Sequence, residues 1–391
     1  MTVWIVNPFD NLPAEGCRPQ RYWLMAEAFS VAGHDVTLWT QDWSHAKKSR
    51  RKISPAGGIF SLRFVHVPGY RRNICFKRIW SHWRFAKNWF SDAERMAEKP
   101  QLVVVSSPPL FIGSEVRRFC TDFGAKYVVD IMDAWPETFE RVVPRWSLFW
   151  MQMIARGNYR GATGVTAVTK SYLELAKGYG AECPMHLCYH GIRLPQELCE
   201  SRALRRRERS LVRLVYIGNM SLSYDLATVV DAVKSDAGLE LVLAGSGPDE
   251  ASLRERAAGC SRIRFCGYLD ENRLCSLLLS ADIGVVPMFD ESCVGVPYKL
   301  ADYVAAGLPV VSSLHGETAE LISSHKSGVT YQARDMAAFL NAVRSAVVLD
   351  CSDMALVKLF DSSHLYKNYV VFAESLLASK PSVSGTVGTR V

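Results

Sequence analysis

Short apolar runs alternate with segments of helical periodicity along the first half of this chain, and this alternation constrains its fold more than any other feature. Five runs are expected to form buried strands: Val3–Asn7, Asp35–Trp39, Leu102–Ser106, Tyr127–Asp130 and Val165–Val168. Arg21–Ala32 has the spacing of an amphipathic helix, and Gly33 is expected to end it. Strands separated by helices indicate a parallel sheet with both faces covered.

The alternation is interrupted once and then restarts. Residues 195–209 are polar and charged without a buried period, which predicts a linker. Further strands are expected at Leu214–Ile217, Glu240–Ala244, Ile263–Cys266, Ile283–Val286 and Val310–Ser312, with helices at Leu226–Val233, Glu250–Ala257, Leu274–Leu279 and His364–Leu377. The sequence therefore predicts an α/β protein with two Rossmann-like domains, whose parallel sheets face a cleft, and a C-terminal helix that can cross back to the first domain.

These patterns also predict how the chain is divided, since 391 residues are many for a single core. We expect an N-terminal domain over residues 1–198, a linker over 199–209, a second domain over 210–360, a C-terminal helix over 361–378 and a disordered tail over 379–391. Ligands of open parallel sheets lie beyond the carboxyl ends of the strands, so the strand-end loops are expected to hold the chemistry.

Composition predicts the compartment. No apolar run reaches the length of a membrane span, and the first residues lack the basic region of a signal peptide. The eleven cysteines show no paired zinc-type spacing, which favours reduced thiols. A cytoplasmic protein is therefore expected.

Positive charge is concentrated between Trp43 and Phe90, a window with twelve Lys or Arg residues and no Asp or Glu. Aromatic residues are interleaved with these cations. Three interpretations are open: a membrane interface, a nucleic-acid surface with stacking platforms, and a basic helix whose aromatic residues belong to the core. The lack of acids favours an anionic membrane surface as the partner of residues 43–90, with the protein peripheral at the inner face of the membrane and no nucleic acid expected.

The segment from Pro287 to Val310 carries the strongest functional signal. An apolar strand runs into a loop of small residues, and a helix expected to open near Pro297 carries Lys299 and Asp302 on one face. Backbone N–H groups at a helix N-terminus bind anions, a lysine adds positive charge, and a carboxylate suits the hydroxyls of a ribose. The sequence predicts a nucleotide-sugar site, although both side chains could also be ordinary solvated helix residues.

Weaker candidates follow other expected strands. Gly245 and Gly247 could let the chain approach a nucleotide or only form a tight turn. Three residues after the first strand are candidates for an acceptor or phosphate loop, with surface residues of an ordinary loop as the alternative: Gly16, Arg18 and Arg21. Asp133 and Asp130 are candidate catalytic carboxylates, and capping of the following turn is the alternative for Asp133. His45 is an acceptor-side candidate, whereas His190 is interpreted as structural.

Several motifs, in a fixed order, carry a resemblance to a known family. They are YIGNMS (216–221), LVLAGSGPDEASLR (241–254), IRFCGYLDENRL (263–274) and VPYKLADYVAAGLPVV (296–311), preceded by similar segments at 15–40, 106–111 and 130–137. With these motifs the chain resembles the retaining GT-B glycosyltransferases of family four, which include many bacterial polysaccharide and lipopolysaccharide sugar transferases. The resemblance implies the following donor-binding residues: Gly218, Asn219, Gly245, Gly247, Cys266, Gly267, Tyr268, Cys293, Val294, Gly295, Lys299 and Asp302.

The chain departs from the family pattern at two places. The family's two glutamates, eight positions apart, correspond here to Val294 and Asp302. Its usual Arg and Lys after the first donor-domain strand are also missing, since Asn219 and Tyr224 or Asp225 stand there. Lys299 is therefore expected to take more of the diphosphate charge alone, as a catalytic residue.

The resemblance implies a metal-independent hexosyltransferase that retains anomeric configuration. The expected donor is a UDP- or GDP-linked sugar, and the expected acceptor is lipid-linked or a polysaccharide of the bacterial surface. No Asp-x-Asp motif is present, so no metal and no cofactor are expected. The alternatives are a nucleotide-sugar epimerase, a non-catalytic GT-B binding subunit and a nucleic-acid-binding protein.

Overall fold

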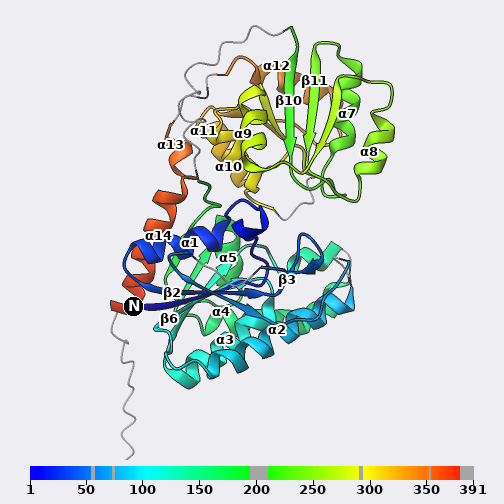
Figure 1. Ribbon diagram of the computed structural model, residues 1–391. Coiled ribbons are helices and arrows are strands. Elements are labelled where there is room, and N and C mark those ends of the chain that lie inside the picture. Colours follow the sequence, from blue (N-terminus) through cyan, green and yellow to red (C-terminus); the bar gives the residue numbers. More distant parts are fainter. Residues whose placement is uncertain are drawn as a thin grey trace, which may run out of the picture.

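The computed structural model describes residues 1–53, 58–72, 75–141, 143–193, 210–289, 294–349, 351 and 354–378. Two α/β units are each built on a parallel sheet, one above the other in Figure 1. The seven-stranded first sheet has the order β5-β2-β1-β6-β7-β8-β9, and every neighbouring pair is parallel. Its strands are β1 (Thr2–Val6), β2 (Asp35–Gln41), β5 (Ser61–Val65), β6 (Leu102–Ser107), β7 (Lys126–Ile131), β8 (Gly164–Ala167) and β9 (Met185–Leu187).

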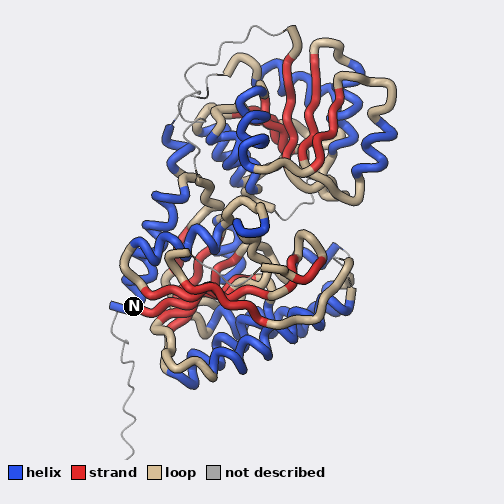
Figure 2. The backbone as a smooth tube through the Cα atoms, viewed as in Figure 1, coloured by secondary structure: helices blue, strands red, loops and turns tan. Residues whose placement is uncertain are grey.

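The second sheet has six strands in the order β12-β11-β10-β13-β14-β15, again all parallel (Figure 2). Its strands are β10 (Val212–Ile217), β11 (Leu239–Ala244), β12 (Ile263–Gly267), β13 (Ile283–Val286), β14 (Val310–Ser312) and β15 (Gly328–Thr330). A short antiparallel hairpin of β3 (Trp43–Ser44) and β4 (Ser49–Arg50) stands apart from both sheets.

Helices cover both faces of the first sheet, as near-continuous apolar strands require. One face packs against α2 (Phe76–Glu94), α3 (Leu110–Phe123) and α4 (Phe149–Arg160), in a core that includes Trp4, Trp39 and Trp89. The other face packs against α1 (Arg21–Val31) and α14 (Ser362–Ala378). The remaining elements of this unit are η1 (Pro13–Glu15), η2 (Glu137–Arg141), η3 (Arg145–Leu148) and α5 (Lys170–Gly178).

The second sheet is also covered on both faces. Helices α7 (Leu226–Ser235), α8 (Glu250–Arg256) and α12 (Met336–Ala346) enclose a core of their own on one face. On the other face lie α9 (Glu271–Ser280), α10 (Tyr298–Ala305), α11 (Glu317–Ser324) and α13 (Met354–Lys358). The apolar core on this second face is continuous with the α1 and α14 side of the first unit, so the two units share buried surface.

The C-terminal helix α14 crosses back to the first unit (Figure 1). It packs along α1, and its Tyr369 hydroxyl lies 3.1 Å from the Thr166 hydroxyl of β8. Oε1 of Glu374 lies 3.1 Å from Nε2 of His34. The Lys126 ammonium group donates a hydrogen bond to the Leu376 carbonyl at 2.5 Å. The predicted crossing of this helix is therefore confirmed.

The predicted fold class is confirmed, with every expected strand and helix present within a few residues of its expected bounds. The linker at 199–209 and the tail at 379–391 lie outside the described residues, so these two predictions stay as they were. No helix in the described ranges is both long and apolar enough to cross a bilayer.

Candidate functional site at the junction of the two units

Three strand-end loops of the second sheet are fastened to one another. Gly218, directly after β10, donates its N–H to the Ala244 carbonyl at 2.9 Å, and Gly245 donates to the Gly267 carbonyl at 2.7 Å. Gly245 has φ +127°, and a Cβ at this position would lie 2.0 Å from the Gly218 oxygen. A Cβ on Gly247 would lie 2.1 Å from the Met220 oxygen. These glycines therefore permit close packing between the loops, which sets the position of Gly218.

Lys299 lies in the first turn of α10 and points into this group of loops. It is 6% exposed, and its Nζ has no hydrogen-bond partner among the described residues. The ammonium group sits over the rings of Tyr216 and Tyr224, 4.0 Å and 3.9 Å from their centroids. Burial lowers the pKa of Lys299 well below its usual value of 10.5. A buried, uncompensated cation is costly in a folded protein, so this position suits an anion that arrives as ligand.

Gly218, after β10, lies directly against the Lys299 side chain. A Cβ built on Gly218 would lie 3.5 Å from the Lys299 Nζ, so any larger residue would stand between the loop and the cation. Gly218 and Asn219 are both exposed. The exposed backbone of the β10 loop and the start of α10 therefore lie next to the Lys299 ammonium group.

Asp302, one turn further along α10, forms an ion pair with a residue of the other unit. Arg18 donates from Nη1 to Asp302 at 2.5 Å and also lies 3.6 Å from Glu271 of α9. Burial opposes the charge of Arg18, but the two carboxylates more than offset it, so the pKa of Arg18 is raised. The expected ribose-binding carboxylate is therefore part of an ion pair between the units.

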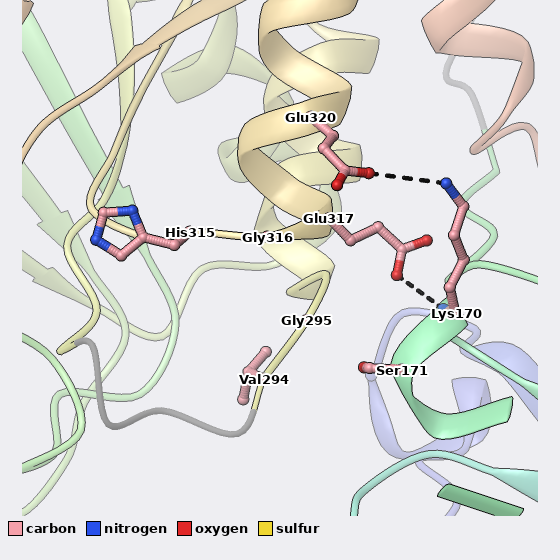
Figure 3. Close-up of a pocket in the computed structure, with 8 residues that line it drawn as sticks. All are labelled: Lys170, Ser171, Val294, Gly295, His315, Gly316, Glu317 and Glu320. Atoms are coloured by element: carbon pink, nitrogen blue, oxygen red, sulfur yellow. Dashed lines mark hydrogen bonds and ion pairs between the residues drawn. The ribbon is translucent and has the colours of Figure 1, made fainter. Parts of the chain in front are cut away.

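A hollow of about 470 Å³ opens between the two units, where Val294 and Gly295 face α5 and α11 (Figure 3). Glu317 accepts a hydrogen bond from the backbone N–H of Lys170 at 2.7 Å and another from the Tyr189 hydroxyl at 2.7 Å. A Cβ on Gly295 would lie 2.7 Å from Cγ2 of Thr169, so the two units touch closely here. No local pattern predicts the contact between Glu317 and Lys170, because these residues meet only in the tertiary structure.

The remaining donor-side candidates lie around the same edge. Cys266 and Tyr268 are exposed at the end of β12, and Gly267 between them has φ +65°. The Tyr268 ring therefore presents an open face next to the loop of Arg18, whose charge acts on the Tyr268 hydroxyl. Cys293 lies outside the described residues.

Asp130 and Arg21 are corrected by the structure. The guanidinium of Arg21 donates two hydrogen bonds to the Asp130 carboxylate at 2.7 Å, and two more to the carbonyl oxygens of Cys188 and Tyr189. Both side chains are at most 1% exposed. Thr166 donates a further bond to Asp130. This buried pair fastens α1 to β7, so neither residue is accessible as a catalytic carboxylate or as a phosphate ligand.

Asp133 takes the capping role that was the alternative for it. Its carboxylate accepts from the Ala134 N–H at 2.9 Å, the Thr138 hydroxyl at 3.1 Å and the Trp135 indole N–H at 3.2 Å. Burial raises the pKa of Asp133, and these hydrogen bonds only partly oppose that rise. Asp133 therefore has the capping contacts of the alternative role, and its role as a catalytic base stays a prediction.

The other N-terminal candidates are spread along the same strand ends. Gly16 ends η1 with φ +74°, which fixes the turn that leads into Arg18. The Nδ1 of His45 lies 2.6 Å from the Tyr70 hydroxyl, and burial together with nearby cations lowers the pKa of His45 to about 3. His190 is buried with its ring stacked 3.6 Å from that of Tyr298 at the start of α10. Its predicted structural role thus consists of packing between the units.

Comparisons with known proteins agree with this geometry. Residues 21–195 match the family model described as Glycosyltransferase Family 4, and residues 212–347 match the model described as Glycosyl transferases group 1. Together the two matches cover most of the chain, one on each α/β unit. The chain therefore belongs to the GT-B glycosyltransferases.

Curated relatives match over part of their length. The chain is 30% identical over 154 residues to a glycogen synthase of Mycobacterium tuberculosis, which is 37% of this chain and 36% of the relative. It is 33% identical over 143 residues to a GDP-mannose-dependent alpha-(1-6)-phosphatidylinositol dimannoside mannosyltransferase of the same species, 35% of each chain. The matches thus span about a third of the relatives' length.

Solved structures share the whole fold. The sucrose-phosphate synthase of Thermosynechococcus elongatus superposes with a TM-score of 0.73 at 16% identity, over 97% of this chain and 100% of the other. Anabaena HepE, solved in complex with UDP-glucose, superposes with a TM-score of 0.65 at 12% identity, over 96% and 100%. At these identities the likeness supports the fold alone.

Proposed function

We propose that the protein is a retaining glycosyltransferase that moves a sugar from a nucleotide-sugar donor to a lipid-linked or polysaccharide acceptor of the bacterial surface. One observation carries the proposal: the buried Lys299 ammonium group, without a hydrogen-bond partner among the described residues, at the start of a helix facing the other unit. Anabaena HepE binds UDP-glucose, and one relative is named as GDP-mannose dependent, which supports a UDP- or GDP-linked donor.

The proposed chemistry follows from charge development. As the bond from the sugar to the diphosphate lengthens, negative charge builds on the leaving group. A cation already buried beside the site stabilises that charge strongly, because little water screens it and no reorganisation is needed. Lys299 and the first N–H groups of α10 would supply the positive charge, so the proposal needs no metal ion.

Asp302 would bind the ribose of the donor. A carboxylate can accept two hydrogen bonds from neighbouring hydroxyls, and Asp302 lies one turn from Lys299 on the same helix. Arg18 must first release it, which couples donor binding to movement between the units. Closure around both substrates would align the acceptor hydroxyl and exclude water that hydrolyses the donor.

The proposal is tested first by ligand screening. UDP-, GDP-, ADP- and dTDP-sugars are added singly, and the melting temperature is measured, because a ligand that binds the native state raises it. The donor so identified is then mixed with a crude glycolipid acceptor. Transfer with retained anomeric configuration supports the proposal, whereas inverted product, an isomerised sugar with free nucleotide, or no reaction contradicts it.

The role of Lys299 is tested by Lys299→Ala, which should lower turnover by about 10²-fold or more while the circular dichroism spectrum persists. Lys367→Ala is the matched control, since Lys367 is an exposed lysine of α14 that is not among the residues of this site. Near-normal transfer by Lys299→Ala would remove this residue from the mechanism.

A further inference from the structure

The first residue of α11 reaches across the junction to the other unit. Helix α11 begins after Gly316, which has φ +66°, and Glu317 then points toward the start of α5 (Figure 3). One carboxylate oxygen of Glu317 accepts a hydrogen bond from the backbone N–H of Lys170 at 2.7 Å, and the other accepts one from the Tyr189 hydroxyl at 2.7 Å. We call these two hydrogen bonds the Glu317 contact.

The start of α5 suits a carboxylate from another part of the chain. Lys170 is the first residue of this helix, so its N–H has no partner within the helix and lies at the positive end of the helix dipole. The Thr169 side chain caps the same helix by accepting from the N–H of Tyr172, which leaves the N–H of Lys170 for Glu317. The second unit therefore completes the N-terminus of a helix in the first unit.

The second donor, Tyr189, is held by the buried ion pair of the first unit. Its carbonyl oxygen accepts a hydrogen bond from Arg21, whose guanidinium is bound by Asp130. Tyr189 is 6% exposed, and burial together with Glu317 raises the pKa of its hydroxyl, which therefore stays a neutral donor. Both donors of the Glu317 contact thus belong to the buried framework of the first unit.

The residue after Glu317 extends this contact to the loop before α10. Thr318 is fully buried, and its hydroxyl donates to the Gly295 carbonyl at 2.5 Å. Gly295 approaches the first unit closely, since a Cβ on it would lie 2.7 Å from Cγ2 of Thr169. Lys299 follows Gly295 by only four positions. The position of Lys299 relative to the first unit therefore depends on how α11 is joined to α5.

An exposed ion pair beside the Glu317 contact differs from it in kind. The Lys170 ammonium group lies 3.8 Å from Glu320, and the two side chains are 63% and 69% exposed (Figure 3). Exposed pairs of this kind add little to the free energy of folding. Glu317 instead uses both carboxylate oxygens on a backbone N–H and a buried hydroxyl, and charge-assisted hydrogen bonds of this type are stronger.

We propose that Glu317 is a positioning residue for sugar transfer, because the Glu317 contact sets how the start of α10 faces the strand ends of the first unit. This inference rests on the proposed function, in which the second unit binds the donor and the first unit holds the acceptor. A displacement of about 1 Å between reacting groups can lower turnover by about 10²-fold. Loss of the Glu317 contact should therefore lower the rate of transfer and leave donor binding as it is.

The backbone half of the contact can be removed alone. Lys170→Pro deletes the N–H, and proline is compatible with the first position of a helix and with the extended Thr169 before it, at φ −150° and ψ 155°. Lys170→Ala is the matched control, since it removes the same side chain but keeps the N–H. Lys170→Pro should have a kcat about tenfold or more below that of Lys170→Ala. Equal kcat values in these two variants would overturn the proposal.

The carboxylate half is tested by Glu317→Gln, because a glutamine has one oxygen and its NH2 group would face one of the two donors. The kcat should fall by about tenfold or more. The affinity for the nucleoside diphosphate, measured by calorimetry, should change by less than about threefold, since Lys299 and the Arg18–Asp302 pair are not altered. Glu320→Gln is the matched control and should change neither quantity. An equal loss of kcat and affinity in Glu317→Gln would overturn the positioning role.

Hydrogen exchange separates this inference from the proposed function, because it requires no reaction. Peptides that cover residues 294–305 are followed by mass spectrometry in the full chain without added ligand. In Glu317→Gln these amides should exchange about tenfold faster than in Glu320→Gln, since the loop before α10 is held less firmly. Unchanged exchange alongside normal transfer by the wild-type protein would overturn this inference alone. A wild-type protein without transferase activity would overturn the proposed function, and the positioning role with it.

Discussion

At the scale of the single residue, Lys299 is the most informative position of the molecule. Its ammonium group is buried, lies between two tyrosine rings and has no hydrogen-bond partner in the described ranges. Cation–π contacts with Tyr216 and Tyr224 return part of the lost hydration energy. The remainder lowers the stability of the ligand-free protein, which is a common property of binding sites.

This imbalance predicts that Lys299→Met stabilises the ligand-free protein by about 1–3 kcal/mol in urea denaturation, because an apolar chain of similar length removes a buried charge. The pKa of Lys299 is lowered on folding, so between that value and 10.5 the unfolded chain holds a proton that the folded chain does not. The free energy of unfolding of the wild-type protein must therefore rise with pH in this window. The difference in unfolding free energy between the wild-type and Lys299→Met proteins must become smaller. A less stable Lys299→Met protein would contradict the assignment, and Lys367→Met serves as the control.

Sequence reasoning found Lys299 and Asp302 because both lie in one short motif. It could not find Tyr216 and Tyr224 as neighbours of the ammonium group, since three separate segments meet there. It also misjudged Asp130 and Arg21. These two residues are 109 positions apart, and no local pattern indicates that one neutralises the other. A charged residue at a strand end can equally be a ligand contact or half of a buried pair.

At the scale of the element, alternation of apolar and helical segments was sufficient to predict most of both sheets. The edge strands β9 and β15 were missed because none of their three residues is buried, whereas the equally short β14 is fully buried and was predicted. Strand β5 was missed because exposed Ser61 and Arg63 alternate with buried Leu62 inside a window dominated by charge. The buried Arg21–Asp130 pair is a second feature of this scale, since it joins α1 to β7.

We predict that Asp130→Ala lowers the free energy of unfolding by about 3–5 kcal/mol, because it leaves the Arg21 guanidinium buried without its counter-charge. The measurement is urea denaturation followed by fluorescence. Asp122→Ala, which removes an exposed carboxylate of α3, should change stability little. If Asp130→Ala left the free energy of unfolding unchanged but abolished turnover, Asp130 would instead be a catalytic residue.

At the scale of the whole molecule, three of the contacts that the described residues make between the two units bear on the proposed function. Helix α14 packs on the first unit, Glu317 contacts Lys170 and Tyr189, and Arg18 pairs with Asp302. The last contact occupies a carboxylate that the proposed donor needs. Donor binding and the relative position of the units should therefore be coupled.

Arg18→Gln tests this coupling. In this variant, Asp302 can bind the donor without first breaking its ion pair with Arg18. The affinity for the donor nucleotide, measured by calorimetry, should therefore rise by about fivefold or more. Arg254→Gln, which removes an exposed ion pair within α8, should leave the affinity unchanged. A weaker affinity in Arg18→Gln would mean that Arg18 itself binds the donor and would contradict the competition.

The central claim is that Lys299 binds the diphosphate of a nucleotide. Its most direct test is calorimetric titration of the nucleoside diphosphate found by screening, in two buffers of different ionisation enthalpy at alkaline pH. Burial lowers the pKa of Lys299, and a bound anion should raise it again. The wild-type protein should therefore take up protons on binding. Lys299→Met should bind about 10²-fold more weakly and take up none. Equal affinity and equal proton uptake in the two proteins would contradict the account.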